Sequence, residues 1–119
     1  VFISTVAGAT TLFSCSLGDI VKTDFGKKII IDLFNECRSI AQFYKYDYED
    51  SEADIILKTI TISGSPIKAS MQRDVEKNSF TEHEQIFGDL ITKGKKYNFD
   101  CPILMSCYVR MNVYQRNLT

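Results

Sequence analysis

The segment from Asp24 to Tyr44 constrains the fold more than any other part of the chain, because its apolar residues recur at helical spacing. Thr23 or Asp24 can cap such a helix by accepting a hydrogen bond from a free N–H group of the first turn. Polar side chains take the opposite face, which predicts one amphipathic helix over about 24–44. The residues of the apolar face are Phe25, Ile29, Leu33, Cys37, Ile40, Ala41 and Tyr44.

After this helix the apolar residues alternate with polar ones, as they do in a strand that buries one face. Gly64-Ser65-Pro66 indicates a turn, and Lys93-Gly94-Lys95 indicates a hairpin with glycine at a positive φ. One helix followed by antiparallel strands predicts an α+β fold, with one main α-helix packed on an antiparallel β-sheet. The expected strands cover 10–17, 53–63, 67–72, 85–92 and 97–113, and the last range is either one long strand bent at Pro102 or two strands that flank it.

The length of 119 residues predicts a single domain, 1–119, with one core. The apolar opening segment, 1–11, has two interpretations: the end of a secretory signal, since Ala7-Gly8-Ala9 resembles a cleavage site, or a first β-strand or hairpin. The absence of an initiator Met is expected of a processed, secreted protein. No apolar run reaches the roughly 20 residues that span a bilayer, so no membrane partner is expected.

Four cysteines are present, an even number that allows three pairings. No C-x-x-C pair occurs and His83 is the only histidine, which argues against a structural metal site. Disulfides are the favoured interpretation, and they indicate an oxidising compartment. Cys37 lies on the apolar helical face and could instead be a free, buried thiol.

Catalytic residues are not evident in this sequence. His83 lies between Glu82 and Glu84, but neighbours along a strand point to opposite faces, so a solvated histidine in a polar loop is expected. No G-x-S-x-G elbow is present, and no cofactor is expected. The net charge of −1 gives no general attraction to nucleic acid. A small basic patch could still contact RNA phosphate and stack one base, and it comprises Lys93, Lys95, Lys96 and Tyr97.

Phe13-Ser14-Cys15 is an aromatic-x-Cys motif, followed by apolar residues at Ile20, Phe25 and Ile29 and a late Cys107. Over about 12–108 this pattern resembles the RNase-like effectors secreted by powdery mildew fungi. The resemblance implies a ribonuclease T1-like fold with Cys15 joined to Cys107. Cys37 and Cys101 would then be an additional pair or two free thiols.

The resemblance also implies a function. Most of these avirulence-type proteins lack the catalytic residues of the ribonucleases. They reach the cytoplasm of the host cell and bind host plant proteins, and some are recognised by nucleotide-binding leucine-rich-repeat (NLR) immune receptors. We therefore expect a secreted virulence effector that is not an enzyme. An alternative is a secreted carrier of a small ligand or lipid, enclosed by an apolar sheet.

Overall fold

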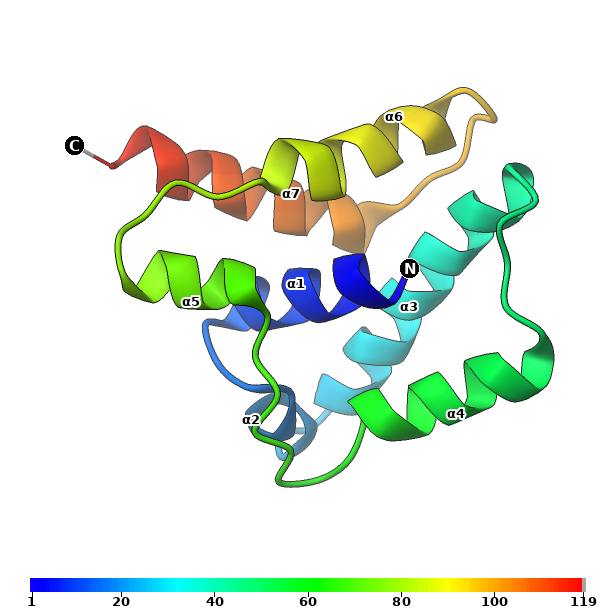
Figure 1. Ribbon diagram of the computed structural model, residues 1–119, viewed down its shortest axis with the longest axis horizontal. Helices are drawn as coiled ribbons and strands as arrows, with labels where there is room; N and C mark the ends of the chain where they lie inside the picture. The colour runs from blue at the N-terminus through cyan, green and yellow to red at the C-terminus, as the bar shows by residue number, and fades with distance from the viewer. Residues whose placement is uncertain (119) are drawn as a thin grey trace.

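The computed structural model describes residues 1–118, and within them every regular element is a helix (Figure 1). The prediction of an α+β fold is therefore wrong, because no β-strand forms in this part of the chain. The helices are α1 (Phe2–Phe13), α2 (Leu17–Val21), α3 (Gly26–Phe43), α4 (Asp50–Ile60), α5 (Ser70–Glu76), the π-helical turn η1 (Glu84–Gly88), α6 (Asp89–Lys95) and α7 (Pro102–Arg116).

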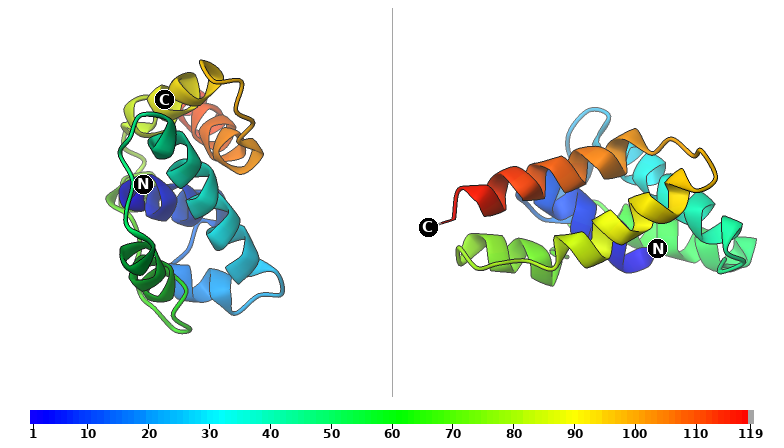
Figure 2. Two further views of the ribbon diagram at one scale, coloured as in Figure 1. Left: turned by 90° about the vertical axis from the view of Figure 1, so that its right-hand side faces the viewer. Right: turned by 90° about the horizontal axis from the view of Figure 1, so that it is seen from above.

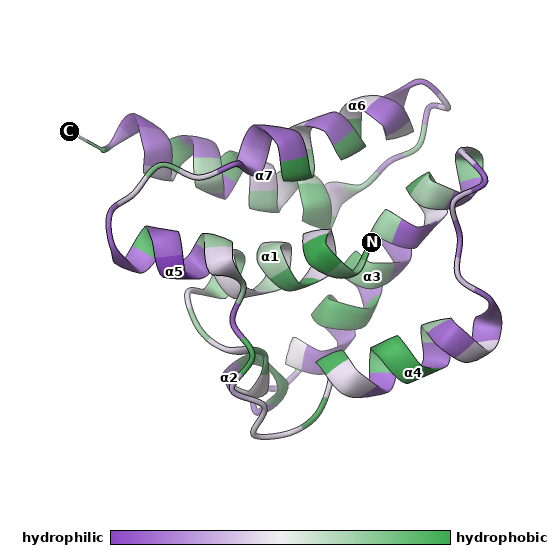
Figure 3. Cartoon of the chain, in the orientation of Figure 1, coloured by the Kyte–Doolittle hydropathy of each residue, from purple (hydrophilic) through white to green (hydrophobic). Residues whose placement is uncertain are grey.

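Helix α1 forms the centre of the molecule and contacts α2, α3, α5, η1 and α7. Its residues from Ser4 to Thr11 are all buried, and the helix carries no charged side chain. Figure 3 shows this helix as apolar to weakly polar, in contrast to its mixed neighbours. The expectation that 1–11 is a strand or hairpin is therefore wrong. A helix covered on all sides has no polar face, so it shows no helical period in its sequence.

The buried hydroxyl groups of α1 are satisfied within the helix. Thr10 Oγ1 donates to the carbonyl of Val6 at 2.8 Å, and Thr11 Oγ1 donates to that of Ala7 at 2.7 Å. Thr10 Oγ1 also accepts a hydrogen bond of 3.3 Å from the backbone N–H of Ala69, just before α5. Polar side chains can thus be buried here at little cost, since each has a partner.

Helix α1 packs closely against its neighbours at Gly8. A Cβ atom at this position would lie 3.0 Å from Leu33 Cδ2 on α3 and 3.1 Å from Cys107 Sγ on α7. The absence of a side chain at Gly8 therefore allows α1, α3 and α7 to pack closely at this position.

The predicted amphipathic helix is confirmed as α3, which begins and ends within two residues of the expected bounds. Its buried face includes Leu33, Phe34, Cys37 and Ile40. Phe25 lies outside the core: it precedes α3 at a φ of 69° and is 79% exposed.

The segments expected to be strands after α3 form helices, apart from the loop residues 61–63, 67–69 and 97–101, because their buried residues recur at intervals of three and four. In α4, Ala53 and Ile60 are buried with Ile56 and Leu57 packed beside them. The β-branched residues of this segment favour a strand only weakly, and packing outweighs that preference. Gly94 does not turn a hairpin, since it lies inside α6, where a Cβ atom would be 3.2 Å from Ile40.

The loop between α4 and α5 is tied to α2 by two backbone hydrogen bonds. Leu17 N–H donates to Ile67 O at 2.9 Å, and Gly18 N–H donates to Ser65 O at 3.0 Å. A Cβ atom on Gly18 would lie 2.4 Å from Ser65 N, so only glycine fits.

Helix α7 is positioned by a side chain from α3. The carboxylate of Glu36 accepts hydrogen bonds from the backbone N–H groups of Ile103 at 3.1 Å and Leu104 at 2.9 Å. Pro102 at the first position of the helix has no N–H to satisfy. A negative charge at a helix N-terminus is favourable, but partial burial outweighs that effect and raises the pKa of Glu36 above its ordinary value of 4.5.

Candidate functional site

Three adjoining hollows surround the N-terminal end of α1, and together we call them the α1 groove. Their volumes are about 400, 300 and 300 Å³. The first and second share Val1, Leu90 and Lys93, and the second and third share Ile3 and Ile86. Ligand sites are typically such concave, largely apolar regions with a few polar groups. The polar and charged residues that line the groove are Ser4, Tyr44, Tyr46, Asp47, Tyr48, Lys68, Ser70, Gln85, Asp89 and Lys93.

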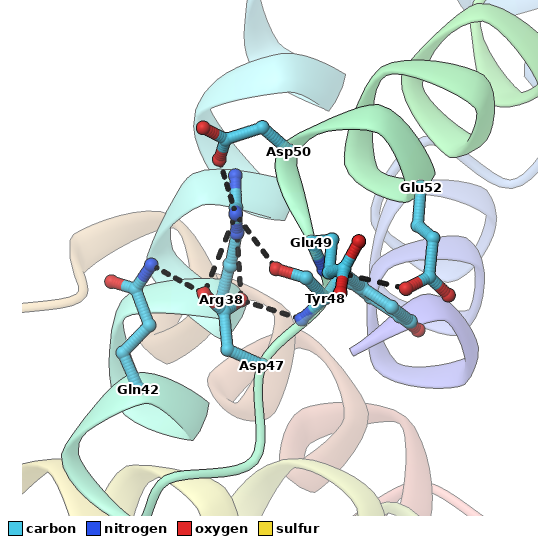
Figure 4. Close-up of polar contacts among 7 residues, drawn as sticks. All are labelled: Arg38, Gln42, Asp47, Tyr48, Glu49, Asp50 and Glu52. Carbon is cyan, nitrogen blue, oxygen red and sulfur yellow. Dashed lines mark hydrogen bonds and ion pairs between the residues drawn. The ribbon is translucent and has the colours of Figure 1, made fainter.

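The segment 44–48, which contributes three tyrosines to the groove, is held in place by Arg38 of α3 (Figure 4). Arg38 Nε donates to Asp47 Oδ1 at 2.7 Å, and its Nη2 atom donates to Tyr48 O at 3.1 Å and to Asp50 Oδ1 at 3.0 Å. Gln42 adds a bond of 2.9 Å to Asp47. These bonds, the Arg38 contact first, lower the pKa of Asp47, so its charge in the groove is already neutralised by a partner.

The two lysines of the groove differ in their partners. Lys68 Nζ forms an ion pair of 2.9 Å with Glu76, which lowers the pKa of Glu76. Lys93 Nζ lies 5.5 Å from the centre of the Tyr44 ring, and in residues 1–118 no carboxylate lies within ion-pair distance of it. Lys93 is therefore the cation of the groove that remains available for an anionic ligand.

The basic patch expected from the sequence is divided by the fold. Lys93 lines the α1 groove, whereas Lys95 and Lys96 are exposed at the end of α6 and line none of its hollows. The ring of Tyr97 stacks on Phe43, with centroids 4.6 Å apart and planes at 3°.

His83 is buried, so the expectation of a solvated histidine is wrong. Its Nδ1 atom lies 2.8 Å from Thr81 Oγ1, and its Nε2 atom lies 2.9 Å from Asn112 Oδ1 on α7. The carboxylate of Glu84 accepts a hydrogen bond of 2.6 Å from the Tyr108 hydroxyl, which raises the pKa of Tyr108. His83 thus joins the start of η1 to α7.

All four cysteines are free thiols in the structure, so it contains neither the Cys15–Cys107 bridge nor one between Cys37 and Cys101. Cys15 is half-buried in the loop after α1, whereas the other three are buried. Burial raises the pKa of Cys101 to about 11 and that of Cys107 to about 12. Thiols of such high pKa are mostly protonated at neutral pH and react slowly.

Neither a metal centre nor a membrane-spanning helix is found in the described part of the chain. Within residues 1–118, no three His, Cys, Asp or Glu side chains gather in a way that could hold a metal ion. None of the helices in this range is both long and apolar enough to cross a membrane.

Comparison with known proteins identifies relatives of a different kind from those expected. A family model described as the C-terminal part of ketopantoate reductase PanE/ApbA matches residues 1–115. The Bacillus subtilis protein named uncharacterized oxidoreductase YkpB is 30% identical over 114 residues, which cover 96% of this chain and 38% of that protein.

Two solved structures share the fold. The dimeric ketopantoate reductase from Staphylococcus aureus matches with a TM-score of 0.82 at 18% identity, over 99% of this chain and 42% of that one. D-mandelate dehydrogenase with NADH and anilino(oxo)acetate matches with a TM-score of 0.81 at 21% identity, over 98% of this chain and 39% of that one. The chain thus spans about two fifths of the length of each relative.

These matches correct the functional expectations. The resemblance to secreted RNase-like effectors is wrong, since the matching family and the named relatives are reductases and dehydrogenases. The expectations of a non-enzymatic effector and of a ligand carrier are wrong for the same reason. The expected partners, host plant proteins, an NLR receptor or RNA, receive no support from these relatives.

Proposed function

Because the chain belongs to the ketopantoate reductase PanE/ApbA C-terminal family, we propose that it is the helical, substrate-binding part of an oxidoreductase that acts on 2-oxo or 2-hydroxy acids. Ketopantoate is a 2-oxo acid and D-mandelate is a 2-hydroxy acid, so the two enzymes of known structure act on one chemical class. Every substrate of this class carries a carboxylate beside the reacting carbon.

The observation that carries this proposal is the environment of Lys93. A substrate carboxylate needs a cation that is not already paired, and Lys93 meets this requirement in the α1 groove while Lys68 is paired with Glu76. The apolar residues Ile3, Ile86 and Leu90 beside it suit the carbon skeleton of the substrate. We assign to Lys93 the binding of the carboxylate.

The residues of this chain do not fit a dinucleotide cofactor such as the NADH bound by D-mandelate dehydrogenase. A dinucleotide site typically needs a strand followed by G-x-G-x-x-G and a helix. Residues 1–118 contain no strand, and the six glycines of the chain are never two residues apart. We therefore assign cofactor binding to a part of the enzyme other than these residues and derive no chemical step from it.

The proposal is tested by steady-state kinetics of the enzyme that carries this chain, with ketopantoate and benzoylformate as substrates and NADH or NADPH as the reductant. We expect Lys93→Met to raise KM at least about tenfold and to change kcat less, because it removes binding energy rather than a reacting group. The matched controls, Lys95→Met and Lys96→Met, remove a lysine from the same helix end outside the groove and should change KM less than about twofold.

Two outcomes would overturn the proposal. One is the absence of turnover with any 2-oxo acid in the wild-type enzyme. The other is an equal rise of KM in the Lys93→Met and Lys95→Met variants, which would show that the general positive charge of α6, and not the groove, attracts the substrate.

A further inference from the structure

The side chain of Tyr44, at the C-terminal end of α3, contacts both the backbone and the charged group of Lys93 on α6. Its hydroxyl donates a hydrogen bond of 3.0 Å to the carbonyl oxygen of Lys93, and Lys93 Nζ lies over its ring, 5.5 Å from the centre. Figure 2 shows the end of α3 beside α6 in both views. A cation within about 6 Å of the centre of an aromatic ring is attracted to its face.

The ring of Tyr44 is itself held by other aromatic rings. Tyr97 meets it edge to face, with centroids 5.5 Å apart and planes at 85°. Tyr97 in turn stacks on Phe43, and Phe99 meets Phe43 at 70°. Aromatic pairs prefer these geometries, so each ring restricts the rotation of the next. The orientation of the Tyr44 ring is thus set before a ligand enters the α1 groove.

The backbone that carries this ring is fixed as well. The N–H groups of Tyr44 and Tyr46 both donate to the carbonyl of Ala41, at 3.0 and 2.9 Å, and so end α3. Further along, Asp47 is bound by Arg38, as Figure 4 shows. Neither the ring nor its backbone has to be ordered when a substrate binds.

A ring and a carboxylate affect a lysine differently. Glu76 forms an ion pair of 2.9 Å with Lys68 and cancels its charge. The neutral ring of Tyr44 attracts the ammonium group of Lys93 through the negative potential of its face and adds no net charge. Lys93 is therefore held in place while its full positive charge stays available for an anion.

We propose that Tyr44 is a positioning residue, which holds the ammonium group of Lys93 where it binds the carboxylate of a 2-oxo or 2-hydroxy acid. A lysine side chain has many rotamers, and a ligand that binds it must restrict them. The Tyr44 ring restricts them in advance, so less binding energy is lost on ordering. This inference rests on the proposed function, in which Lys93 binds the substrate.

The first test is a double-mutant cycle in the enzyme that carries this chain, with ketopantoate and benzoylformate as substrates and NADH or NADPH as the reductant. We expect Tyr44→Leu to raise KM at least about threefold and to change kcat less. In the Lys93→Met background the same substitution should change KM less than about 1.5-fold, because no ammonium group is left to position. Tyr44→Phe keeps the ring and should raise KM less than Tyr44→Leu.

The matched control is Tyr114→Leu. Tyr114 is also half-buried, and its hydroxyl also donates to a backbone carbonyl, that of Ser79 at 2.7 Å, but it lines none of the hollows of the α1 groove. It loses a comparable structural contact, so KM should stay within about twofold. Far-UV circular dichroism checks that the variants remain helical.

The second test leaves Tyr44 in place and uses NMR of the enzyme labelled with ¹³C at the Cε atoms of its lysines. Protons above the face of an aromatic ring are shifted upfield by the ring current. We expect the Hε signal of Lys93, identified as the one that Lys93→Met removes, to lie upfield of that of Lys95. If Tyr44→Leu does not fold, this signal decides the matter.

The outcomes separate this inference from the proposed function. If Lys93→Met leaves KM unchanged, the proposed function is wrong and this inference falls with it. If Lys93→Met raises KM but Tyr44→Leu does not, only this inference is wrong. It is also overturned by an unshifted Lys93 signal, by an equal rise of KM in Tyr114→Leu, or by an equal effect of Tyr44→Leu in both backgrounds, which would mean that Tyr44 contacts the substrate directly.

Discussion

Helices α1 and α3 meet at Gly8, yet they are built on opposite principles. Helix α1 is buried around its whole circumference, has no charge and satisfies its hydroxyl groups internally. Helix α3 buries one face and gives the other to charged residues such as Lys28 and Asp32. The comparison shows that α3 can accept substitutions on its exposed face without losing stability, whereas α1 can accept almost none.

The largest loss of stability is expected from a substitution on the buried face of α3. Phe34→Ala should lower the free energy of unfolding by about 3–5 kcal/mol, because it empties a fully buried site next to Tyr48. Phe25→Ala is the matched control: the ring is mostly exposed, so the change should stay within about 0.5 kcal/mol. Urea denaturation followed by circular dichroism measures both, and equal losses would contradict the two-faced description of α3.

A somewhat smaller loss of stability is expected from a substitution at the contact between α1 and α3. Gly8→Leu should destabilise the protein by about 1–3 kcal/mol, since its side chain must displace Leu33 and Cys107. Asn35→Leu adds the same side chain to an exposed position of α3 and should change stability by less than about 0.5 kcal/mol. A neutral Gly8→Leu variant would mean that the two helices do not approach as closely as described.

Within α1, the neighbouring residues Thr10 and Thr11 should contribute differently to stability. Thr10→Val leaves the backbone N–H of Ala69 without its acceptor and should lower the unfolding free energy by about 1–2 kcal/mol. Thr11→Val, equally buried, removes a hydroxyl that bonds only within α1, so we expect a smaller loss. Thermal and urea unfolding compare the pair; equal losses would show that the bond to Ala69 contributes nothing.

The carboxylate that α3 extends toward α7 should make the stability of the protein depend on pH. The pKa of Glu36 is raised in the folded state, so the folded protein holds this proton at pH values where the unfolded chain has lost it. The contribution of Glu36 is therefore complete below pH 4.5 and is lost as the pH rises through the raised pKa. Relative to Glu36→Gln, the wild type should lose stability over this window in urea unfolding series, and parallel curves would refute the prediction.

Treatment with a reducing agent is expected to leave the stability of the protein unchanged, which is the smallest effect of the series. Because all four cysteines are free, dithiothreitol should leave the melting temperature of the protein unaltered. A thiol reagent should label Cys15 first, while the thiol of Cys37, buried where α3 faces α1, should react only on unfolding. Peptide mapping without reductant checks the result, and a linked Cys15–Cys107 peptide would contradict it.

The difference between α1 and α3 also explains what the sequence can predict. The period of α3 is visible because water on one face demands polar residues there. In α7, Cys107, Val109, Met111 and Val113 alternate as in a strand, although alternate members belong to opposite faces of one helix. A helix that is apolar on two sides therefore produces the same pattern as a half-buried strand.

The candidate site was only partly predictable. The basic pattern around Gly94 predicts a binding role for Lys93, which lines the α1 groove, but Ile3, Ser70 and Gln85 carry no local signal. They come together only because α5 and η1 both pack against α1, and such contacts between distant segments leave no trace in local spacing.

The central position of α1 has a consequence for synthesis. The helix that every neighbour covers precedes all the other helices of this chain, and the helix that completes its cover, α7, is made last. On the ribosome, α2 and α3 can cover part of α1 early, but its cover is complete only when α7 has been made. We expect nascent chains that stop before Pro102 to be held by chaperones or to aggregate.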